Sequence, residues 1–232
     1  MSGLSYRMLA NGDAGLSVIF NHPLSERLSR QIHWLANYVK SHGAGQVVDV
    51  IPAYQSLTVH FSPGAEQHNY WYKLLNDTLS QPLPLDDYSS QLIDIPVCYE
   101  GPYGPDLNHV AKACGLSEAE VVTLHCSSEY LVHMLGFAPG FLYLGGLPDV
   151  LHCPRKSTPT LRVAPGSVGI GGSQTGIYPY ASPGGWQLIG RSPIRLFNPQ
   201  AAQSCLLKPL DKVRFYPISQ QQFKHLSEQH EH

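Results

Sequence analysis

Apolar positions in the N-terminal third of the chain follow two different periods. Leu57, Val59 and Phe61 alternate with polar residues, which is typical of a strand with one buried face. Between residues 24 and 39 the apolar residues recur at steps of three and four, which predicts an amphipathic helix that ends near Gly43. The same reasoning predicts strands at 5–9, 16–20 and 46–51, and a second helix around residues 71–78. This ββαββα order favours a small antiparallel sheet with helices on one face.

A polar, proline-rich segment at residues 81–87 separates this pattern from the next one. Ser117 and Glu120 form the S-x-x-E pattern of a capping box, which predicts the start of a helix. The other elements expected here are strands at 92–97, 130–135 and 212–217, and helices at 105–114 and 117–125. We therefore expect an α+β sandwich domain over residues 1–90, a β-rich domain over 91–218 and an irregular polar tail over 219–232.

Residues 136–199 contain twelve of the chain's 21 glycines and nine of its 19 prolines. Glycine adopts backbone angles that are closed to other residues, and proline fixes φ and removes a hydrogen-bond donor. Large apolar side chains such as Phe141, Ile170 and Trp186 are interspersed among them and favour burial, unlike the residues of a flexible linker. This composition predicts short strands joined by tight turns and closed into a compact β unit.

The overall composition excludes several classes of function. A net charge of −2 over 232 residues gives no reason to expect nucleic-acid binding. No apolar run approaches the ~20 residues of a membrane span, and the N-terminus lacks the pattern of a signal peptide. The five cysteines include no C-x-x-C pair and the histidines show no ligand spacing. We therefore expect reduced thiols, no metal site and a cytoplasmic protein.

Charged residues are unevenly distributed in the glycine-rich part of the chain. No Asp or Glu lies between Asp149 and Asp211. Six basic residues lie in that interval: Arg155, Lys156, Arg162, Arg191, Arg195 and Lys208. Such a segment either lines a cleft for an anionic ligand or presents its charges separately to solvent, and the sequence leaves both open. Any carboxylate base must come from elsewhere in the chain or from another subunit.

Upstream of the glycine-rich segment, His125 and Glu129 are the candidates for proton transfer. Histidine titrates near neutral pH and is therefore suited to acid–base catalysis. The alternative is a histidine that packs or caps at the end of a helix. Cys126 is not expected to act as a nucleophile with His125, because adjacent helical residues do not face each other.

The glycine-rich turn around Gly171 and Gly172 is a candidate binding site. It lacks the lysine of a phosphate-binding loop, so its backbone amides either approach an anion or form a β-turn only. Gln174, Thr175 and Tyr178 would supply neutral donors beside this turn. All five residues are candidates for binding a small-molecule substrate.

The following strand supplies two further candidates. Trp186 is either a core residue or a platform for a ligand. Simple alternation along residues 186–191 predicts that Gln187 and Arg191 share a face of the strand. Arg191 is therefore expected to bind a substrate carboxylate or a phosphate through its forked donors.

Three long motifs resemble signature blocks of the 5-oxoprolinase B-subunit family. They are GFAPGFLYLGGL at 136–147, VAPGSVGIGGSQTGIYP at 163–179 and SPGGWQLIGRSP at 182–193. Further matches are GDAGL at 12–16, PAYQSLTVHF at 52–61, YGPDL at 103–107 and HCSSEYLVHMLGF from His125. The family includes the Kip inhibitor of a sporulation histidine kinase and one half of the carboxyltransferase domain of urea carboxylase. The resemblance covers nearly the whole chain and implies an α+β N-terminal domain followed by a mostly-β, cyclophilin-like barrel domain.

The resemblance also implies a function. It suggests the B subunit of ATP-dependent 5-oxoprolinase, which opens 5-oxo-L-proline to L-glutamate together with the A and C subunits. ATP would be bound by the complex rather than by this chain alone, and the isolated chain would be inactive. Because His125 opens a matched block, the resemblance favours it over the other histidines. The alternative is a regulatory protein that inhibits a sensor histidine kinase, as the Kip inhibitor does.

Overall fold

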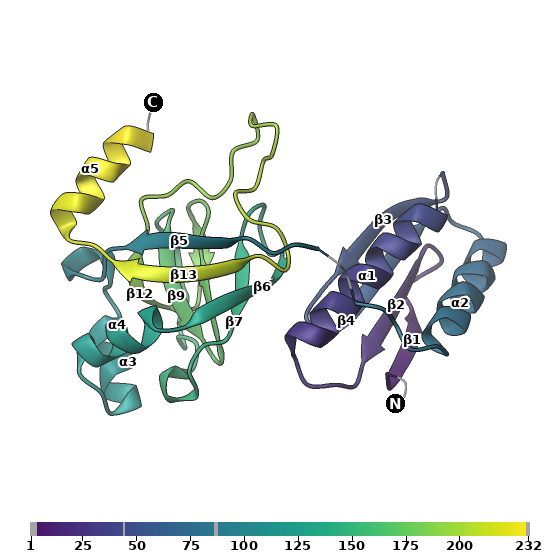
Figure 1. The fold of residues 1–232 in the computed structure, drawn as a ribbon, viewed down its shortest axis with the longest axis horizontal. Coiled ribbons are helices and arrows are strands. Elements are labelled where there is room, and N and C mark those ends of the chain that lie inside the picture. The colour runs from purple at the N-terminus through teal and green to yellow at the C-terminus, as the bar shows by residue number, and fades with distance from the viewer. Residues whose placement is uncertain (1–3, 44, 86–87, 231–232) are drawn as a thin grey trace. The chain divides into compact units, whose positions relative to one another are not determined.

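The chain folds into two units, Met1–Ser89 and Ser90–His232 (Figure 1). The computed structural model describes residues 4–43, 45–85 and 88–230. Each unit has a hydrophobic core of its own, as the residue clusters in the two parts show. Within the described residues, no helix combines the length and the apolar character that crossing a bilayer requires.

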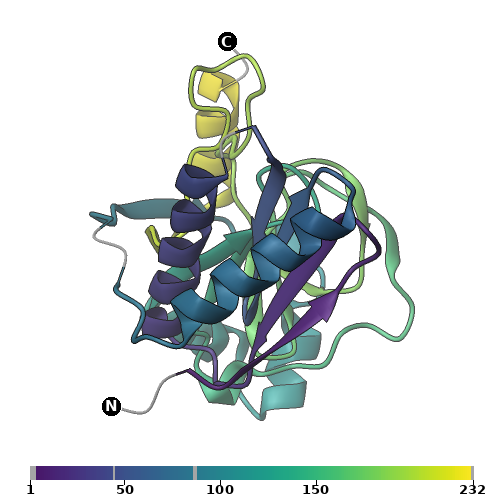
Figure 2. The same ribbon diagram turned by 90° about the vertical axis from the view of Figure 1, so that its right-hand side faces the viewer.

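The N-terminal unit is an antiparallel sheet with strand order β1-β2-β4-β3 and two helices. Its elements are β1 (Tyr6–Ala10), β2 (Gly15–Phe20), α1 (Glu26–His42), β3 (Val47–Pro52), β4 (Ser56–Phe61) and α2 (Ala65–Leu79). Leu16 of β2 opposes Val59 of β4 on the buried face of the sheet. That face shares one core with Ile32 of α1 and Trp71 of α2, so both helices cover the same side (Figure 2). The predicted α+β layer is confirmed.

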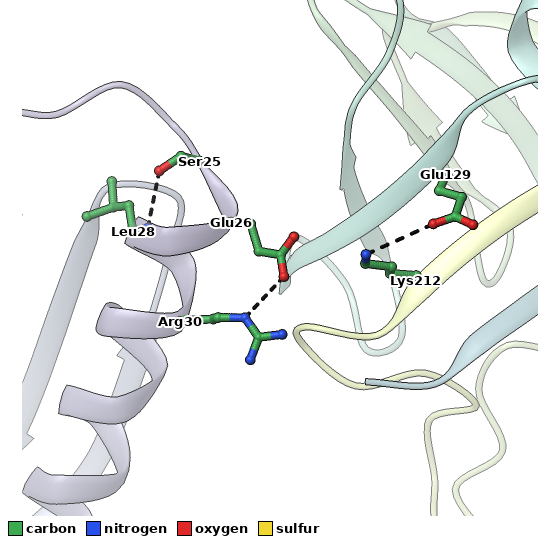
Figure 3. Close-up of polar contacts among 6 residues, drawn as sticks. All are labelled: Ser25, Glu26, Leu28, Arg30, Glu129 and Lys212. Atoms are coloured by element: carbon green, nitrogen blue, oxygen red, sulfur yellow. Dashed lines mark hydrogen bonds and ion pairs between the residues drawn. The ribbon is translucent and has the colours of Figure 1, made fainter. Parts of the chain in front are cut away.

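Helix α1 begins at a side-chain cap. The hydroxyl of Ser25 accepts a hydrogen bond from the backbone N–H of Leu28 at 3.2 Å (Figure 3). In the first turn, Glu26 pairs with Arg30 at 3.1 Å between Oε1 and Nε. An acidic residue at this end also interacts favourably with the helix dipole. The apolar residues that the sequence pattern predicted on one face of α1 then pack against the sheet.

The C-terminal unit is built on a seven-stranded sheet with the order β12-β9-β10-β7-β6-β13-β5. Strands β13 and β5 are parallel, and the other neighbours are antiparallel. A separate pair, β11 with β8, lies outside this sheet. The elements are β5 (Leu92–Val97), η1 (Gly101–Tyr103), α3 (Leu107–Cys114), α4 (Glu118–Cys126), β6 (Glu129–Leu135), β7 (Leu142–Gly145), η2 (Asp149–Leu151), β8 (Thr160–Val163), β9 (Ser167–Gly171), β10 (Gln174–Ile177), β11 (Ser182–Gly184), β12 (Gln187–Arg191), β13 (Lys212–Pro217) and α5 (Gln220–His230).

The two edge strands of this sheet meet and close it into a barrel. Cys98, directly after β5, exchanges backbone hydrogen bonds with Arg191 at the end of β12, at 2.8 and 2.9 Å. Closure removes the unpaired edges that an open sheet presents to solvent. The nearly closed mixed barrel agrees with the predicted fold class.

Side chains from every wall fill the barrel, and two helices pack against it. The core includes Ile95, Val132, Ile170 and Phe215, all with no solvent exposure or nearly none. Helix α3 packs on β12 and α4 packs on β13. The predicted capping box at the start of α4 is present. At the surface of β13, Lys212 Nζ lies 4.0 Å from Glu129 Oε2 of β6 (Figure 3).

The prediction of an irregular tail from Ser219 onward is wrong for residues 220–230, which form α5. Ser219 and Gln222 exchange hydrogen bonds in the manner of a capping box: Ser219 Oγ accepts from Gln222 N, and Gln222 Oε1 accepts from Ser219 N. Phe223 is buried and packs with Cys98 and Ile218. A cap and two apolar residues, buried Phe223 and partly buried Leu226, therefore hold this helix. The last two predicted tail residues lie outside the described part of the chain.

The cap of α1 gives a first prediction. Ser25→Ala should lower the free energy of unfolding by about 1 kcal/mol, because Leu28 N–H loses its acceptor, and Ser25→Asp should retain most of it. Urea denaturation of the full chain, followed by far-UV circular dichroism, measures the change. Ser89→Ala, at an exposed position outside the helices and strands, is the control and should shift the midpoint little. Equal shifts for the two alanine variants would contradict a capping role.

Candidate functional site

Tyr178 and Trp186 line the same cavity on the barrel unit, here called the aromatic cavity. Its volume is about 260 Å³. Its lining residues are Phe137, Phe141, Tyr143, Arg155, Pro159, Tyr178, Pro183, Gly184, Gly185 and Trp186. The aromatic rings meet edge to face, with centroid separations of 5.1 Å for Phe141–Tyr178 and 5.5 Å for Phe141–Trp186. Such edge-to-face contacts fix the ring orientations and leave a defined hollow.

Glycines in β9 and β10 make room for the indole of Trp186. A Cβ added to Gly171 would overlap the indole nitrogen, and one added to Gly176 would lie 2.9 Å from the ring. A Cβ on Gly169 would lie 3.1 Å from the Trp186 Cβ. The glycine pattern of this segment therefore serves the close approach of one large side chain to a strand backbone.

The turn at Gly171 and Gly172 does not fit a phosphate cradle. The N–H of Gly172 donates to the carbonyl of Cys153 at 2.8 Å, and Gly172 accepts from Cys153 N–H at 3.2 Å. Gly171 pairs with Gln174 in the β9–β10 hairpin. Gly172 has φ +67°, as a tight turn requires. Of the two interpretations of this turn, the structure favours β-turn geometry.

His125 and Thr175 come together inside the barrel, away from the aromatic cavity. Both have no solvent exposure. His125 Nε2 lies 3.0 Å from Thr175 Oγ1, and His125 Nδ1 lies 2.8 Å from the hydroxyl of Tyr99. The imidazole also stacks on Phe215, with centroids 4.6 Å apart. His125 therefore joins α4 to β10 and to the segment after β5.

The hydrogen-bond network fixes the state of this histidine. Thr175 gives its one proton to the carbonyl of Gly169, so its oxygen accepts from His125 Nε2–H. Nδ1 is then the acceptor for the hydroxyl of Tyr99. Burial lowers the pKa of His125 to about 3. A neutral, enclosed imidazole with both nitrogens bonded favours the packing interpretation over proton transfer to a substrate.

The predicted common face of Gln187 and Arg191 is wrong, because β12 contains a bulge. Gln187 opposes Ile170, but after the register shift Arg191 opposes Ser167, and alternate residues of β9 point to opposite faces. Arg191 Nε donates to the carbonyl of Pro165 at 2.7 Å, and its guanidinium lies 5.7 Å from the ring centroid of Phe223. Arg191 thus borders a second hollow, here called the arginine cavity, which Arg195 and residues of α5 also line.

Gln187 lines a third hollow, here called the polar cavity, at the start of α3. Asp106 stands at the N-cap position of α3 but makes no capping bond to the helix. Its Oδ2 instead accepts from Lys156 Nζ at 2.6 Å and from the backbone N–H of Leu188 at 2.7 Å. Both side chains of the ion pair are about four-fifths buried. A carboxylate from outside the acid-free segment therefore neutralises one of its six cations.

The basic residues do not converge on one cleft. Arg155 borders both the aromatic and the polar cavity, whereas Arg191 and Arg195 border the arginine cavity. The guanidinium carbon of Arg155 lies 5.9 Å from the ring centroid of Trp186. Sequence reasoning placed Arg155 among the basic residues but did not select it for the site. The sequence marks Arg155 only by its position in the segment without Asp or Glu, and five other basic residues lie in the same segment.

No group of three or more His, Cys, Asp or Glu suited to a metal occurs among the described residues. Gln174 lies at the β9–β10 hairpin, partly exposed, and does not line the three cavities named above. Of the predicted binding residues, only Tyr178 and Trp186 therefore share a cavity.

Comparison with known proteins shows the family of this chain. The family model for the carboxyltransferase domain, subdomain C and D, matches residues 6–207. The B subunit of 5-oxoprolinase from Bacillus subtilis (strain 168) is 39% identical over 94% of this chain and 95% of its own length. The chain belongs to the 5-oxoprolinase B-subunit family. The corresponding 5-oxoprolinase B subunit of Escherichia coli O157:H7 is 59% identical over 55% of this chain and 59% of its own length.

A solved structure supports the fold of this member of the 5-oxoprolinase B-subunit family. The urea amidolyase of K. lactis superposes with a TM-score of 0.81 over 97% of this chain and 16% of its own. The sequence identity of 21% restricts that likeness to the fold. The predicted family and the predicted order of an α+β unit followed by a barrel are both confirmed.

The buried histidine gives a pH prediction. Its folded pKa of about 3 lies below the ordinary 6.5, so the unfolded chain takes up the proton first as pH falls. The stability that neutral His125 contributes is complete above pH 6.5 and is lost toward pH 3, at about 1.4 kcal/mol per pH unit. Urea denaturation at pH 7 and pH 5 should show a weaker pH dependence for His125→Gln than for the wild type. His109→Gln, at an exposed position, should keep the wild-type slope. Equal slopes for all three proteins would refute a neutral buried His125.

The ion pair in the polar cavity gives a further prediction. Asp106→Asn keeps an oxygen for Leu188 N–H but removes the charge beside Lys156, and should lower the free energy of unfolding by about 1–2 kcal/mol. Asp94→Asn is the matched control, because the Asp94–Arg214 pair is about half exposed. Its effect should stay below about 1 kcal/mol. If chemical denaturation shows a larger loss in the free energy of unfolding for Asp94→Asn than for Asp106→Asn, the Asp106–Lys156 pair does not stabilise the fold as proposed.

Proposed function

We propose that this chain is the B subunit of an ATP-dependent 5-oxoprolinase, which opens 5-oxo-L-proline to L-glutamate together with the A and C subunits. The observation that carries the proposal is the match to the 5-oxoprolinase B subunit of B. subtilis, which spans nearly all of both chains. The aromatic cavity with Arg155 at its rim supports it, because it is small and combines apolar walls with a cation.

The chemistry explains why several subunits would share this task. A lactam amide is a poor electrophile, and transfer of a phosphoryl group from ATP to its oxygen activates the carbonyl carbon toward water. After water adds, the C–N bond breaks and opens the ring, and hydrolysis of the resulting acyl phosphate releases phosphate. The activated species needs a site that excludes bulk water and stabilises developing negative charge. This chain has no phosphate-loop motif, and the amide of Gly172 is already bonded. We therefore assign nucleotide binding to the assembled complex rather than to this turn.

Proton transfer is also assigned outside the described aromatic cavity. Its described lining residues include no Asp, Glu or His. The proton-transfer role predicted for His125 would require an imidazole that reaches solvent or substrate, and this imidazole is enclosed. We propose that His125 and Thr175 hold the barrel wall in place, and that a partner subunit supplies the general base.

Reconstitution tests the proposal directly. The purified chain should show no 5-oxoprolinase activity, and adding the A and C subunits of the same organism should produce ATP- and 5-oxo-L-proline-dependent glutamate formation. The physical reason is the lack of a nucleotide motif and of a catalytic carboxylate at the cavity. Turnover by the isolated chain would overturn the shared site. Inhibition of a sensor kinase's autophosphorylation, with no activity in the reconstituted mixture, would favour the regulatory alternative.

A further inference from the structure

The aromatic cavity combines several aromatic rings with a cation among the described residues of the barrel unit. Five aromatic residues line it: Phe137, Phe141, Tyr143, Tyr178 and Trp186. The rings of Phe141 and Tyr143 lie 4.8 Å apart at their centroids. At about 260 Å³ the cavity lies just below the usual range for drug-sized ligands, so it suits a small ring compound better than a nucleotide.

Arg155 supplies the only charge among the described lining residues of this cavity. It forms no ion pair with any described residue, whereas its neighbour Lys156 is paired with Asp106. Its field reaches the cavity wall: burial raises the pKa of the Tyr143 and Tyr178 hydroxyls, and the positive charge of Arg155 opposes that rise. A guanidinium that has no counter-ion among the described residues and lies beside two phenol groups favours an anionic ligand.

We propose that the aromatic cavity binds a small cyclic amide that bears a carboxylate, and that Arg155 holds this carboxylate. The apolar part of the ligand ring lies against the aromatic wall of the cavity. The forked donors of Arg155 match the two carboxylate oxygens. This assignment rests on the proposed function, since 5-oxo-L-proline is such a compound.

The backbone around Arg155 is held in place before any ligand binds. Lys156 N–H donates to the carbonyl of Gly185 at 2.7 Å, and Gln187 Nε2 donates to the carbonyl of Pro154 at 3.0 Å. The Asp106–Lys156 ion pair adds a third attachment on the same side. Residues on either side of Arg155 are thus attached to the strand region that carries Trp186. Such preorganisation lowers the entropy cost of binding.

The polar cavity and the arginine cavity are less suited to bind such a ligand, because their cations other than Arg155 already have partners. In the polar cavity, Lys156 is neutralised by Asp106 at 2.6 Å. In the arginine cavity, Arg191 and Arg195 already donate through Nε to the backbone carbonyls of Pro165 and Phe197. Among their described lining residues, neither cavity brings aromatic walls and an available cation together as the aromatic cavity does.

Steady-state kinetics of the complex with the A and C subunits test the role of Arg155. Arg155→Gln should lower kcat/KM for 5-oxo-L-proline by about 10- to 150-fold, mainly through KM, because a charge-assisted hydrogen bond is lost. Arg155→Lys should recover part of the loss, since an ammonium group keeps the charge without the fork. Arg162→Gln is the matched control: this arginine is exposed, lies in the same acid-free segment and does not line the cavity.

A second ligand identifies the group that Arg155 contacts. 5-Oxo-L-prolinamide has the same ring without the carboxylate, so its inhibition constant should be the same for the wild type and for Arg155→Gln. An equal loss of affinity for acid and amide would overturn the carboxylate contact. If the wild-type complex is active and Arg155→Gln has the same kcat/KM, the role of Arg155 is refuted and the proposed function still stands. A wild-type complex without 5-oxoprolinase activity would overturn the proposed function itself.

Discussion

The contact between the indole of Trp186 and the backbone of β9 and β10 is the constraint on which the barrel surface depends. Gly171 and Gly176 have no room for a Cβ under the ring, so the strands that carry them must use glycine. The indole in turn forms one wall of the aromatic cavity and lies beneath the guanidinium of Arg155. A run of glycines that looks like a flexible or phosphate-binding loop is therefore a rigid seat for one aromatic residue.

Inside the barrel, a polar contact has a different task. Tyr99, His125 and Thr175 form a chain of hydrogen bonds with no solvent exposure at the imidazole. A buried polar chain is stabilising only when each member is satisfied, and here the proton of Thr175 continues to the carbonyl of Gly169. The hydrogen bonds that stabilise this part of the barrel also occupy both nitrogens of the imidazole, so they leave it unsuited to exchange protons with a ligand. A histidine, which is often catalytic in other proteins, has both ring nitrogens bonded inside the core at this position.

The sequence predicted most helices and strands because their signals are local. The alternation in β4 and the S-x-x-E pattern before α4 each lie within a few residues of what they determine. The bulge in β12 depends on pairing with β9 and is invisible to simple alternation, so the face of Arg191 was predicted wrongly. Likewise, the partner of Lys156 is Asp106, which lies far away in the chain, and α5 depends on the packing of Phe223 and Leu226 against Cys98 and Ile218. Side-chain partners and burial are tertiary properties, which propensity and spacing do not report.

The distribution of charge around the aromatic cavity separates the binding of an anion from the transfer of a proton. Its described lining offers a cation and two phenols whose pKa values burial raises, but no carboxylate. Phenols in that state stay protonated near neutral pH, so they donate hydrogen bonds and do not act as bases. Such a wall is suited to bind an anion, but its described residues offer no base for a proton from water or from a ligand. Hydrolysis of a lactam needs both functions, and a second polypeptide that faces this wall with a carboxylate or an imidazole would complete the chemistry that this chain begins.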